Sequence, residues 1–236
     1  EVTVHATEIS GMLRVESPFA IGQNILCPKL PELHKRYPNL SVAVNLTNEP
    51  HSMIERATDV AIRMGRVEDA DLVARPIYEA RYIICGAPSL VIELGSVSPS
   101  ELDPRICMGL LKDNYQTPNL WTLTCQSEEV VIRPQGALSF NNTAALIQAA
   151  TSKMGLIYVL DIFVVEAISQ GKLVQIFSDW ETSVCTFHAV TVKSRFASPK
   201  IRAFIDFMLE VLDPEHRPDL KSQIAVGSDR KMRKLR

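Results

Sequence analysis

The sequence predicts an α/β protein made of two Rossmann-like lobes joined by a double-crossover hinge. A strand–helix–strand pattern occurs twice, across residues 12–46 and across residues 138–160. A strand and an amphipathic helix over residues 184–212 then have no partner left in the second lobe, so they must rejoin the first. The chain is therefore expected to cross between the lobes near 85–89 and near 183–186, and two crossings form a hinge.

The first lobe opens with a strand at residues 12–16, MLRVE. Ser17 is a good helix cap and Pro18 suits a first helical turn, so a helix is expected next, interrupted or bent by two internal prolines. Residues 40–46, LSVAVNL, alternate and are rich in β-branched side chains, which predicts a strand. The crossover is long enough for the two strands to pair in parallel, with the usual right-handed connection.

Further elements complete the sheet of the first lobe. Residues 50–57 predict a short helix, and residues 59–65, DVAIRMG, predict a buried strand. Residues 72–88 are mostly hydrophobic and predict two extended runs that change direction near Glu79 and Ala80. The resulting sheet is expected to be mixed and largely buried.

The second lobe is expected to start after Pro88, with a capped short helix (SPSELD), a strand (ICMGLLK) and two shorter β segments. Residues 138–142, LSFNN, predict a strand that ends at a cap residue, and residues 143–154 an alanine-rich helix closed by Gly155. The strand GLIYVL then completes a second strand–helix–strand unit. A helix over residues 161–170 and the strand KLVQIF follow.

The last elements return to the first lobe. Residues 184–192 are strongly β-forming, and Ser198 and Pro199 start a helix with an apolar stripe on one face. The domain prediction is a first lobe of residues 11–88 and 184–212, a second lobe of residues 89–183, a preceding segment 1–10 and a tail 213–236.

Composition and charge narrow the class of protein. With 46% hydrophobic and 22% charged residues, the 236-residue chain has ordinary globular composition. Residues 214–236 hold seven Lys or Arg and three acidic residues, a charge of +4, so the rest of the chain carries −6 of the total of −2. Because residues 1–213 are negatively charged, they are expected to bind nucleic acid poorly. The tail is expected to be a solvated terminus.

Several kinds of site and location have no support in the sequence. No uncharged apolar run reaches the roughly 20 residues of a membrane span, and the N-terminus shows no secretory signal, although a cleaved one stays open. No histidine pair has metal-ligand spacing, and no glycine loop or nucleophile motif occurs, so we expect no metal, no cofactor and no enzyme. The widely spaced cysteines predict buried free thiols of a reducing, cytoplasmic compartment: Cys27, Cys85, Cys107, Cys125 and Cys185.

A candidate ligand site lies where the predicted strands end, because open α/β sheets bind ligands outside the carboxyl ends of their strands. Polar or donor-rich residues follow these strands: Ser17, Pro18, Thr47, Asn48, Arg63, Asn141 and Asn142. Helix starts at Ser17 and Asn142 would present N–H donors, and the Arg63 guanidinium suits a carboxylate. We therefore expect a small anionic ligand, with Tyr158 as a candidate apolar wall.

A purely structural interpretation of these residues is equally open at this point. Ser17 and Asn142 are also ordinary helix caps. Arg63 could be paired with an acidic neighbour, for which the sequence offers Asp59, Glu68 and Asp69. His51 and Glu49, close to the Thr47 loop, could suggest acid–base chemistry, but no further residue supports it.

Five stretches, in order along residues 11–212, resemble a known family. They are GMLRVESPFAIGQNILCPKLPELHKRYPNLSV; DVAIRMG with DADLVARPI; RYIICGAP; LSFNNTAALIQAATSKMGLIYV; and VQIF followed by FHAVTVKSRFASPKIRAFIDFMLEVL. Together they resemble the C-terminal effector-binding domain of LysR-type transcriptional regulators. Each stretch is loose by itself, but the five in register make a specific signal.

The resemblance implies a periplasmic-binding-protein-like fold of type 2 that senses a small metabolite between its lobes. It implies that the effector contacts are Ser17, Pro18, Thr47, Asn48, Arg63, Asn141, Asn142 and Tyr158. It also implies a homodimer through segments 18–36 and 142–154, a tetramer in the full-length protein, and DNA binding only through a winged helix-turn-helix domain joined by a linker that residues 1–10 would end. An organic acid is the favoured effector class.

Two other functions are known alternatives for a two-lobed α/β chain. A solute-binding protein of a transport system shares the two-lobed fold, but the missing signal sequence and the unpaired cysteines disfavour it. An enzyme on the same scaffold would require a catalytic constellation, which the sequence does not show.

Overall fold

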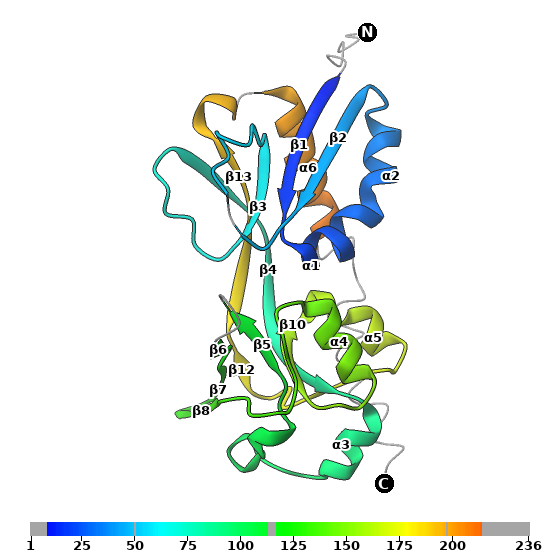
Figure 1. Cartoon of the computed structure of the whole chain (residues 1–236), viewed down its shortest axis with the longest axis vertical. Helices are drawn as coiled ribbons and strands as arrows, with labels where there is room; N and C mark the ends of the chain where they lie inside the picture. The colour runs from blue at the N-terminus through cyan, green and yellow to red at the C-terminus, as the bar shows by residue number, and fades with distance from the viewer. Residues whose placement is uncertain (1–8, 50, 113–116, 197, 214–236) are drawn as a thin grey trace. The chain divides into compact units, whose positions relative to one another are not determined.

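The computed structural model describes residues 9–49, 51–112, 117–196 and 198–213, which form two compact units (Figure 1). Within these residues, unit 1 extends to Glu79 and resumes at Thr186, and unit 2 is Ala80–Cys185. The chain passes between the units inside two long strands, β4 (Leu72–Gly86) and β13 (Val184–Val192). The first passage precedes the stretch 85–89 that the sequence suggested. The basic tail beyond residue 213 lies outside the described residues.

The sheet of unit 1 has the strand order β13, β3, β1, β2. Strand β1 (Gly11–Ser17) pairs in parallel with β2 (Leu40–Leu46) and with β3 (Val60–Met64). Strand β13 pairs antiparallel with β3. The predicted strand–helix–strand unit is therefore present, and the late strand β13 joins the same sheet.

The helix that connects β1 and β2 contains α1 (Phe19–Ile21), a π turn (Gly22–Leu26) and α2 (Cys27–Arg36). In the π turn the Cys27 amide donates to the Gly22 carbonyl, one residue further back than in an α-helix. A proline at position 28 crowds the carbonyl four residues before it, which here lies within the wide turn. The helix therefore continues where the sequence predicted an interruption or a bend.

Helix α6 (Pro199–Leu212) covers unit 1 with the apolar stripe that the sequence predicted. Its buried side chains include Ile201, Phe204, Ile205, Phe207, Met208 and Leu212. The helix packs against α2, where Arg36 donates to both carboxylate oxygens of Glu210 at 2.5 and 2.9 Å. The Arg36 guanidinium also lies over the Phe207 ring, 5.5 Å from its centre.

Unit 2 contains a second strand–helix–strand unit. Strand β9 (Ser139–Phe140) pairs in parallel with β5 (Gly109–Lys112). Helix α4 (Thr143–Thr151) leads from β9 to β10 (Ile157–Leu160). A parallel bridge between Cys107 and Leu156 then places the start of β10 beside the chain that enters β5.

Unit 2 buries one core on each face of its sheet. Strand β4 pairs antiparallel with β10 and with β11 (Val174–Ile176), and alternate residues of these strands face opposite sides. One core contains Ile83 and Val159 with side chains of α4. The other contains Ile84 and Tyr158 and is covered by the hairpin of β7 (Trp121–Cys125) and β8 (Glu128–Ile132), beside β12 (Glu181–Thr182).

The remaining elements of unit 2 are short. They are α3 (Pro88–Leu94), β6 (Thr117–Pro118), α5 (Val165–Ser169), and 3₁₀ turns at Pro99–Glu101, Pro104–Ile106 and Asp161–Phe163. Helix α3 was not predicted. The turn at Pro99–Glu101 has the capping box that the sequence indicated, with Glu101 accepting from the Ser98 amide at 3.0 Å.

Two further predictions about elements are wrong. Residues 53–57 form turns where a helix was predicted, and Ala57 ends them in the left-handed conformation, with φ of 51°. Residues 72–88 do not make two runs, because β4 is continuous and pairs with β13 and then with β10 and β11.

The end of α4 also differs from the prediction, which used Gly155 as the stop. The helix ends at Thr151 with Ser152 as its C-cap, and Lys153 takes the left-handed conformation, with φ of 67°. Gly155 has another role, because a Cβ atom on it would lie 2.6 Å from the Ile106 carbonyl oxygen. Another part of the backbone therefore approaches Gly155 too closely for a side chain.

All five cysteines are free, but they are not all buried as predicted. Cys85 and Cys107 are buried, whereas Cys27 is exposed on the outer side of α2. Burial raises the pKa of both buried thiols to about 12, so they stay protonated. In the described part of the chain, no helix has the length and apolar character to cross a bilayer, and no group of three or more potential ligands is placed to hold a metal ion.

Candidate functional site

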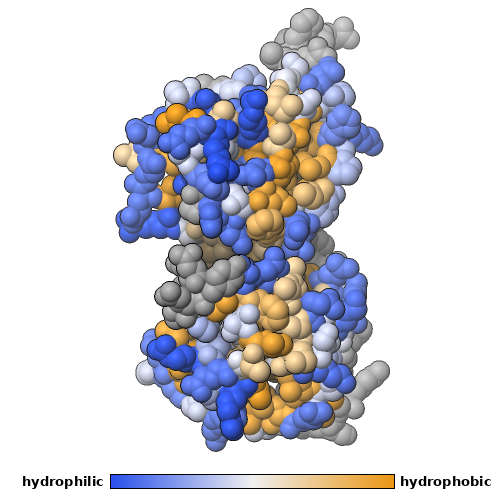
Figure 2. All heavy atoms as spheres, in the orientation of Figure 1, coloured by the Kyte–Doolittle hydropathy of each residue, from blue (hydrophilic) through white to orange (hydrophobic). Residues whose placement is uncertain are grey.

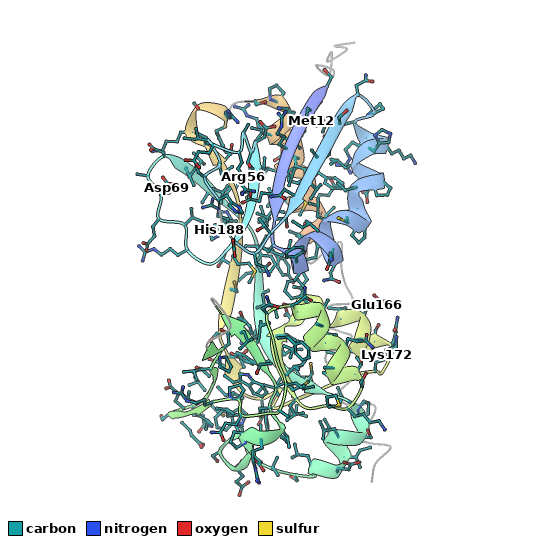
Figure 3. The ribbon with its side chains drawn as sticks, in the orientation of Figure 1. Met12, Arg56, Asp69, Glu166, Lys172 and His188 are labelled. Atoms are coloured by element: carbon teal, nitrogen blue, oxygen red, sulfur yellow. The ribbon has the colours of Figure 1, made fainter. Side chains whose placement is uncertain are left out.

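Four charged or titratable residues of unit 1 lie next to one another, and we call them the unit 1 polar cluster: Glu16, His51, Arg63 and His188. Arg63 on β3 is directly opposite His188 on β13, which Figure 3 labels. The Arg63 guanidinium donates to the His51 carbonyl oxygen at 3.2 Å. His51 Nδ1 lies 3.6 Å from Glu16 Oε2, and the Glu16 side chain is only 7% exposed. Strands β1, β3 and β13 and the loop after β2 each contribute one member.

Three nitrogens of this cluster are buried without a hydrogen-bond partner among the described residues. They are Arg63 Nε, His51 Nδ1 and His188 Nδ1. An unpaired buried polar group costs roughly 1–3 kcal/mol, and more when it is charged. Buried polar groups in folded proteins almost always have a partner. An acceptor from a bound molecule, such as a carboxylate, would satisfy this group of nitrogens.

The expected alternative partners of Arg63 are all engaged elsewhere. Asp59 accepts from Lys200 Nζ at 2.9 Å and lies 3.7 Å from Arg195. Glu68 pairs with Arg66, and Asp69 accepts from the Asp71 amide. Within the described residues Arg63 therefore has no carboxylate partner, which favours the ligand-binding interpretation over the structural one.

The loop after β2 is fixed to the start of the first helix. The Thr47 amide donates to the Ser17 carbonyl oxygen at 2.9 Å, and Asn48 Oδ1 accepts from the Phe19 amide at 3.1 Å. Thr47 Oγ1 accepts from the Glu49 amide at 3.1 Å. Asn48, which is distant in sequence, therefore caps this helix.

The expected cap at Ser17 is wrong for that reason. Ser17 is completely buried, and its hydroxyl donates to the carbonyl oxygen of Pro18, the residue before the helix, at 3.3 Å. The backbone of Ser17 positions the Thr47 loop, while its side chain is an internal group.

The predicted site residues of unit 2 make contacts within the fold of that unit. Asn142 caps α4 as expected, with its Oδ1 accepting from the Ala145 amide at 3.0 Å, and Asn141 beside it is exposed. Tyr158 is 3% exposed, and its hydroxyl donates to the Thr122 carbonyl at 3.2 Å and accepts from the Ser183 amide. Its ring stacks on Tyr82, with centres 4.7 Å apart. Tyr158 is thus an interior residue of unit 2 and does not offer an open apolar wall.

Unit 2 also contains a cavity of about 250 Å³ that the sequence did not suggest. Its lining includes Tyr82, Phe177, Trp180 and Thr182. The cavity shares no residue with the predicted site, and burial keeps the adjoining Tyr82 phenol neutral by raising its pKa to about 12.

Comparison with known proteins decides the family. A family model described as the LysR substrate binding domain matches residues 6–213. This chain belongs to that family. The LysR-type domain is the regulatory domain of LysR-type transcriptional regulators, with effector binding as its family role, and it has the α/β fold of type 2 periplasmic binding proteins.

Individual relatives agree with this assignment. A HTH-type transcriptional regulator of Xanthomonas campestris pv. campestris is 29% identical over 206 residues, covering 86% of this chain and 60% of the relative. CrgA of Neisseria meningitidis serogroup C, a HTH-type transcriptional regulator, is 28% identical over 86% of this chain and 67% of its own length. The relatives are transcriptional regulators and not enzymes.

Solved structures show the same fold. The CrgA regulatory domain superposes with a TM-score of 0.76 at 24% identity, covering 87% of this chain and 100% of that domain. The effector domain of AmpR from Pseudomonas aeruginosa superposes with a TM-score of 0.68 at 17% identity over 89% of this chain and 100% of that one. This LysR-type domain spans 60% and 64% of the length of two of the curated relatives it matches.

Sequence reasoning missed two members of the polar cluster in this LysR-type domain. His188 lies beside Arg63 because of the register of β13 against β3. A local sequence pattern does not predict that register. Glu16 could have been noticed, because it is a charged residue in the buried half of β1. The sequence offers no supporting residue for acid–base chemistry at His51, and its contacts with Arg63 through the carbonyl and with Glu16 through the ring appear only in the structure.

Proposed function

We propose that this chain is the effector-sensing domain of a LysR-type DNA-binding transcriptional regulator and that its effector is an organic acid. The polar cluster of unit 1 would hold the carboxylate of that acid. One observation carries the proposal: Arg63 has a buried Nε without a partner and, within the described residues, no carboxylate at ion-pair distance, although acidic residues lie nearby in sequence.

The chemistry of the cluster suits a carboxylate more than a neutral ligand. A guanidinium binds a carboxylate through charge-assisted hydrogen bonds, which are stronger than neutral ones. The ring nitrogens of His51 and His188 lie on the same cluster and can add polar contacts. Thr47 and Asn48 fix the neighbouring loop, so they belong to the proposed site as supports of its edge. Asn141 and Asn142 remain proposed contacts in unit 2.

The first experiment is a thermal-shift screen of this chain with acetate, succinate, citrate and benzoate, each beside its uncharged amide. A ligand at 100 times its dissociation constant stabilises the folded state by about 2.7 kcal/mol. We expect at least one acid to raise the unfolding midpoint by several degrees while its amide does not. Equal shifts with acid and amide would contradict the proposed anionic effector.

Arg63→Ala should weaken the acid found in that screen by about 1.5–3 kcal/mol, because a charge-assisted hydrogen bond is lost. Calorimetric titration measures the change. Arg66→Ala is the matched control, since the Arg66 side chain is 87% exposed and pairs only with Glu68. Unchanged affinity in Arg63→Ala would assign Arg63 a structural role.

We also propose partners and a location for the whole protein. The relatives are named HTH-type regulators and are longer than this chain, which supports DNA binding through a separate N-terminal domain. Members of the family form oligomers. We propose a homodimer for this chain through segments 18–36 and 142–154, a tetramer for the full-length protein, and a location in the cytoplasm. A solute-binding role in transport is not favoured, because the curated relatives are regulators.

A further inference from the structure

Charge balance in the unit 1 polar cluster bears on how an anion would bind. Glu16 carries a negative charge and is 7% exposed on its side chain, and Arg63 carries a positive charge. With both histidines neutral, these two charges cancel. An entering carboxylate would then leave the cluster with a net negative charge in a site of low exposure, which is energetically costly.

Arg14, two residues before Glu16 on β1, is exposed to solvent, and the other neighbours of the cluster named here are neutral, apolar or acidic. Asn45 on β2 is neutral and approaches Glu16 Oε2 at 3.5 Å. Met53, Ala61 and Val190 form an apolar cluster on the same face of the sheet. Glu79 on β4, the other neighbour of β13, is exposed and negative.

Among the described residues, the other Lys and Arg side chains of unit 1 are either paired with a carboxylate or exposed to solvent. Lys200 and Arg195 form ion pairs with Asp59, and Arg75 forms an ion pair with Asp206. Within the cluster itself, the groups that can supply a compensating positive charge are the two histidines.

The two histidines differ in their neighbours. His51 Nδ1 faces the Glu16 carboxylate at 3.6 Å, so a positive charge on its ring is compensated there. His188 is directly opposite Arg63, where a second positive charge would meet the guanidinium. The geometry therefore separates their roles: His51 can carry a charge and His188 can act as a neutral contact.

We propose that His51 takes up a proton when the cluster binds an anion, so that effector binding by this domain is coupled to pH. The proton comes from solvent and makes the His51 ring a cation between Glu16 and the bound carboxylate. His188 stays neutral and positions the anion beside Arg63. This inference rests on the proposed function, because it concerns the same site.

The test is calorimetric titration of this chain with the acid from the panel above that stabilises it most. Titrations in bis-Tris and in Tris at one pH differ in heat in proportion to the number of protons taken up, because the two buffers have different ionisation enthalpies and neither is an anion. We expect uptake of up to one proton per anion near neutral pH. Affinity should fall by up to tenfold per pH unit on the alkaline side, since the protonated form is the one that binds.

Two variants and a control separate the histidines. His51→Gln should abolish both the proton uptake and the pH dependence, whereas His188→Gln should weaken binding about fivefold and keep the uptake. His34→Gln, at an exposed position of α2, should behave as the unchanged chain.

The possible failures are distinguishable. An acid that binds with no proton uptake and with the same affinity from pH 6 to pH 8 overturns the coupling and leaves the proposed function standing. Uptake that persists in His51→Gln also overturns the role of His51. If no acid binds in preference to its amide, the proposed anionic effector fails, and this inference fails with it.

Discussion

Asp59 and Arg63, at the start and near the end of the same strand region, have opposite environments. The Asp59 carboxylate accepts from the Arg14 amide and from Lys200 Nζ, both at 2.9 Å, and Arg195 lies 3.7 Å away. Its hydrogen-bonding capacity is used within unit 1, so Asp59 is a structural residue that ties α6 to the sheet. Among the described residues Arg63 has no ion-pair partner and donates to the His51 carbonyl oxygen, which supports its proposed role in binding an anion.

Asn142 provides a prediction at the same scale. Asn142→Ala removes the acceptor of the Ala145 amide at the start of α4, so the free energy of unfolding should fall by about 0.5–2 kcal/mol. Urea denaturation followed by circular dichroism measures it. Asn142→Asp keeps a cap acceptor and should stay within about 0.5 kcal/mol of the unchanged chain. Equal losses in both variants would show that the cap is not the source of the effect.

Single residues also show what the sequence could and could not predict about the site. Asn142 was correctly assigned as a cap, because caps are local and lie directly before their helix. Ser17 was wrong, because Asn48 from the next loop occupies the position through a contact over 29 residues. The burial of Tyr158 could not be predicted, because the strand GLIYVL is apolar throughout and its pattern does not tell which core each side chain enters. The position of His188 beside Arg63 could be predicted only from the register of β13 against β3.

At the scale of elements, the order of strands and helices was largely predictable, whereas their ends were not. Hydrophobic periodicity identified β1, β2, β3, β13, α4 and α6, which have long or regular patterns. The π turn before α2 was not predicted, since it is a local solution to a proline inside a helix that must continue. The short α3 was missed because it has only seven residues, and Leu90, Val91 and Leu94, which pack against the core of unit 2, are too few to establish a helical period.

Gly155 gives a prediction about how elements pack. Gly155→Ala would bring a Cβ atom to 2.6 Å from the Ile106 carbonyl oxygen, so the backbone must shift. We expect a loss of about 1–3 kcal/mol in the free energy of unfolding, as for overpacked interiors. Denaturant titration measures this loss. Ser152→Ala, at the exposed end of α4, is the control and should change stability by less than about 0.5 kcal/mol. An unchanged free energy of unfolding in Gly155→Ala would mean that the backbone at Ile106 can move away from residue 155 at little cost.

At the scale of the whole molecule, exposed apolar side chains support self-association. Figure 2 shows apolar surface over β1, β2 and α1 of unit 1. Met12 and Phe19 are 44% and 38% exposed there, and Met154 beyond α4 is 57% exposed. Phe19 and Met154 lie in the two segments proposed as the interface. Large exposed apolar patches are typical of association surfaces.

The proposed homodimer leads to a prediction about mass in solution. Light scattering at micromolar concentration should give about twice the chain mass of 26.3 kDa. Phe19→Glu should shift the population toward the monomer by placing a charge in the interface. Ile92→Glu is the control, because Ile92 is 54% exposed on α3 and lies outside the proposed segments. A monomer for the unchanged chain would remove the proposed interface.

The division of labour in the whole protein leads to a prediction about DNA. This chain should produce no sequence-selective gel shift with duplex DNA, because residues 1–213 carry a net charge of −6. Weak, salt-sensitive and sequence-independent retention through the basic segment 214–236 would be compatible with it. A selective shift that survives 150 mM salt would show that DNA recognition resides in this chain.

The passage of the chain through β4 and β13 has a consequence for biosynthesis. Unit 2 is continuous from Ala80 to Cys185, but unit 1 is split, and its sheet is complete only when β13 and α6 have been added. During translation, all of unit 2 therefore leaves the ribosome before unit 1 is complete. Until β13 is synthesised, the edge of β3 that pairs with β13 has no partner strand. A premature stop codon after residue 185 would leave a foldable second unit attached to an incomplete first one, and such a product would be a natural target for proteolysis.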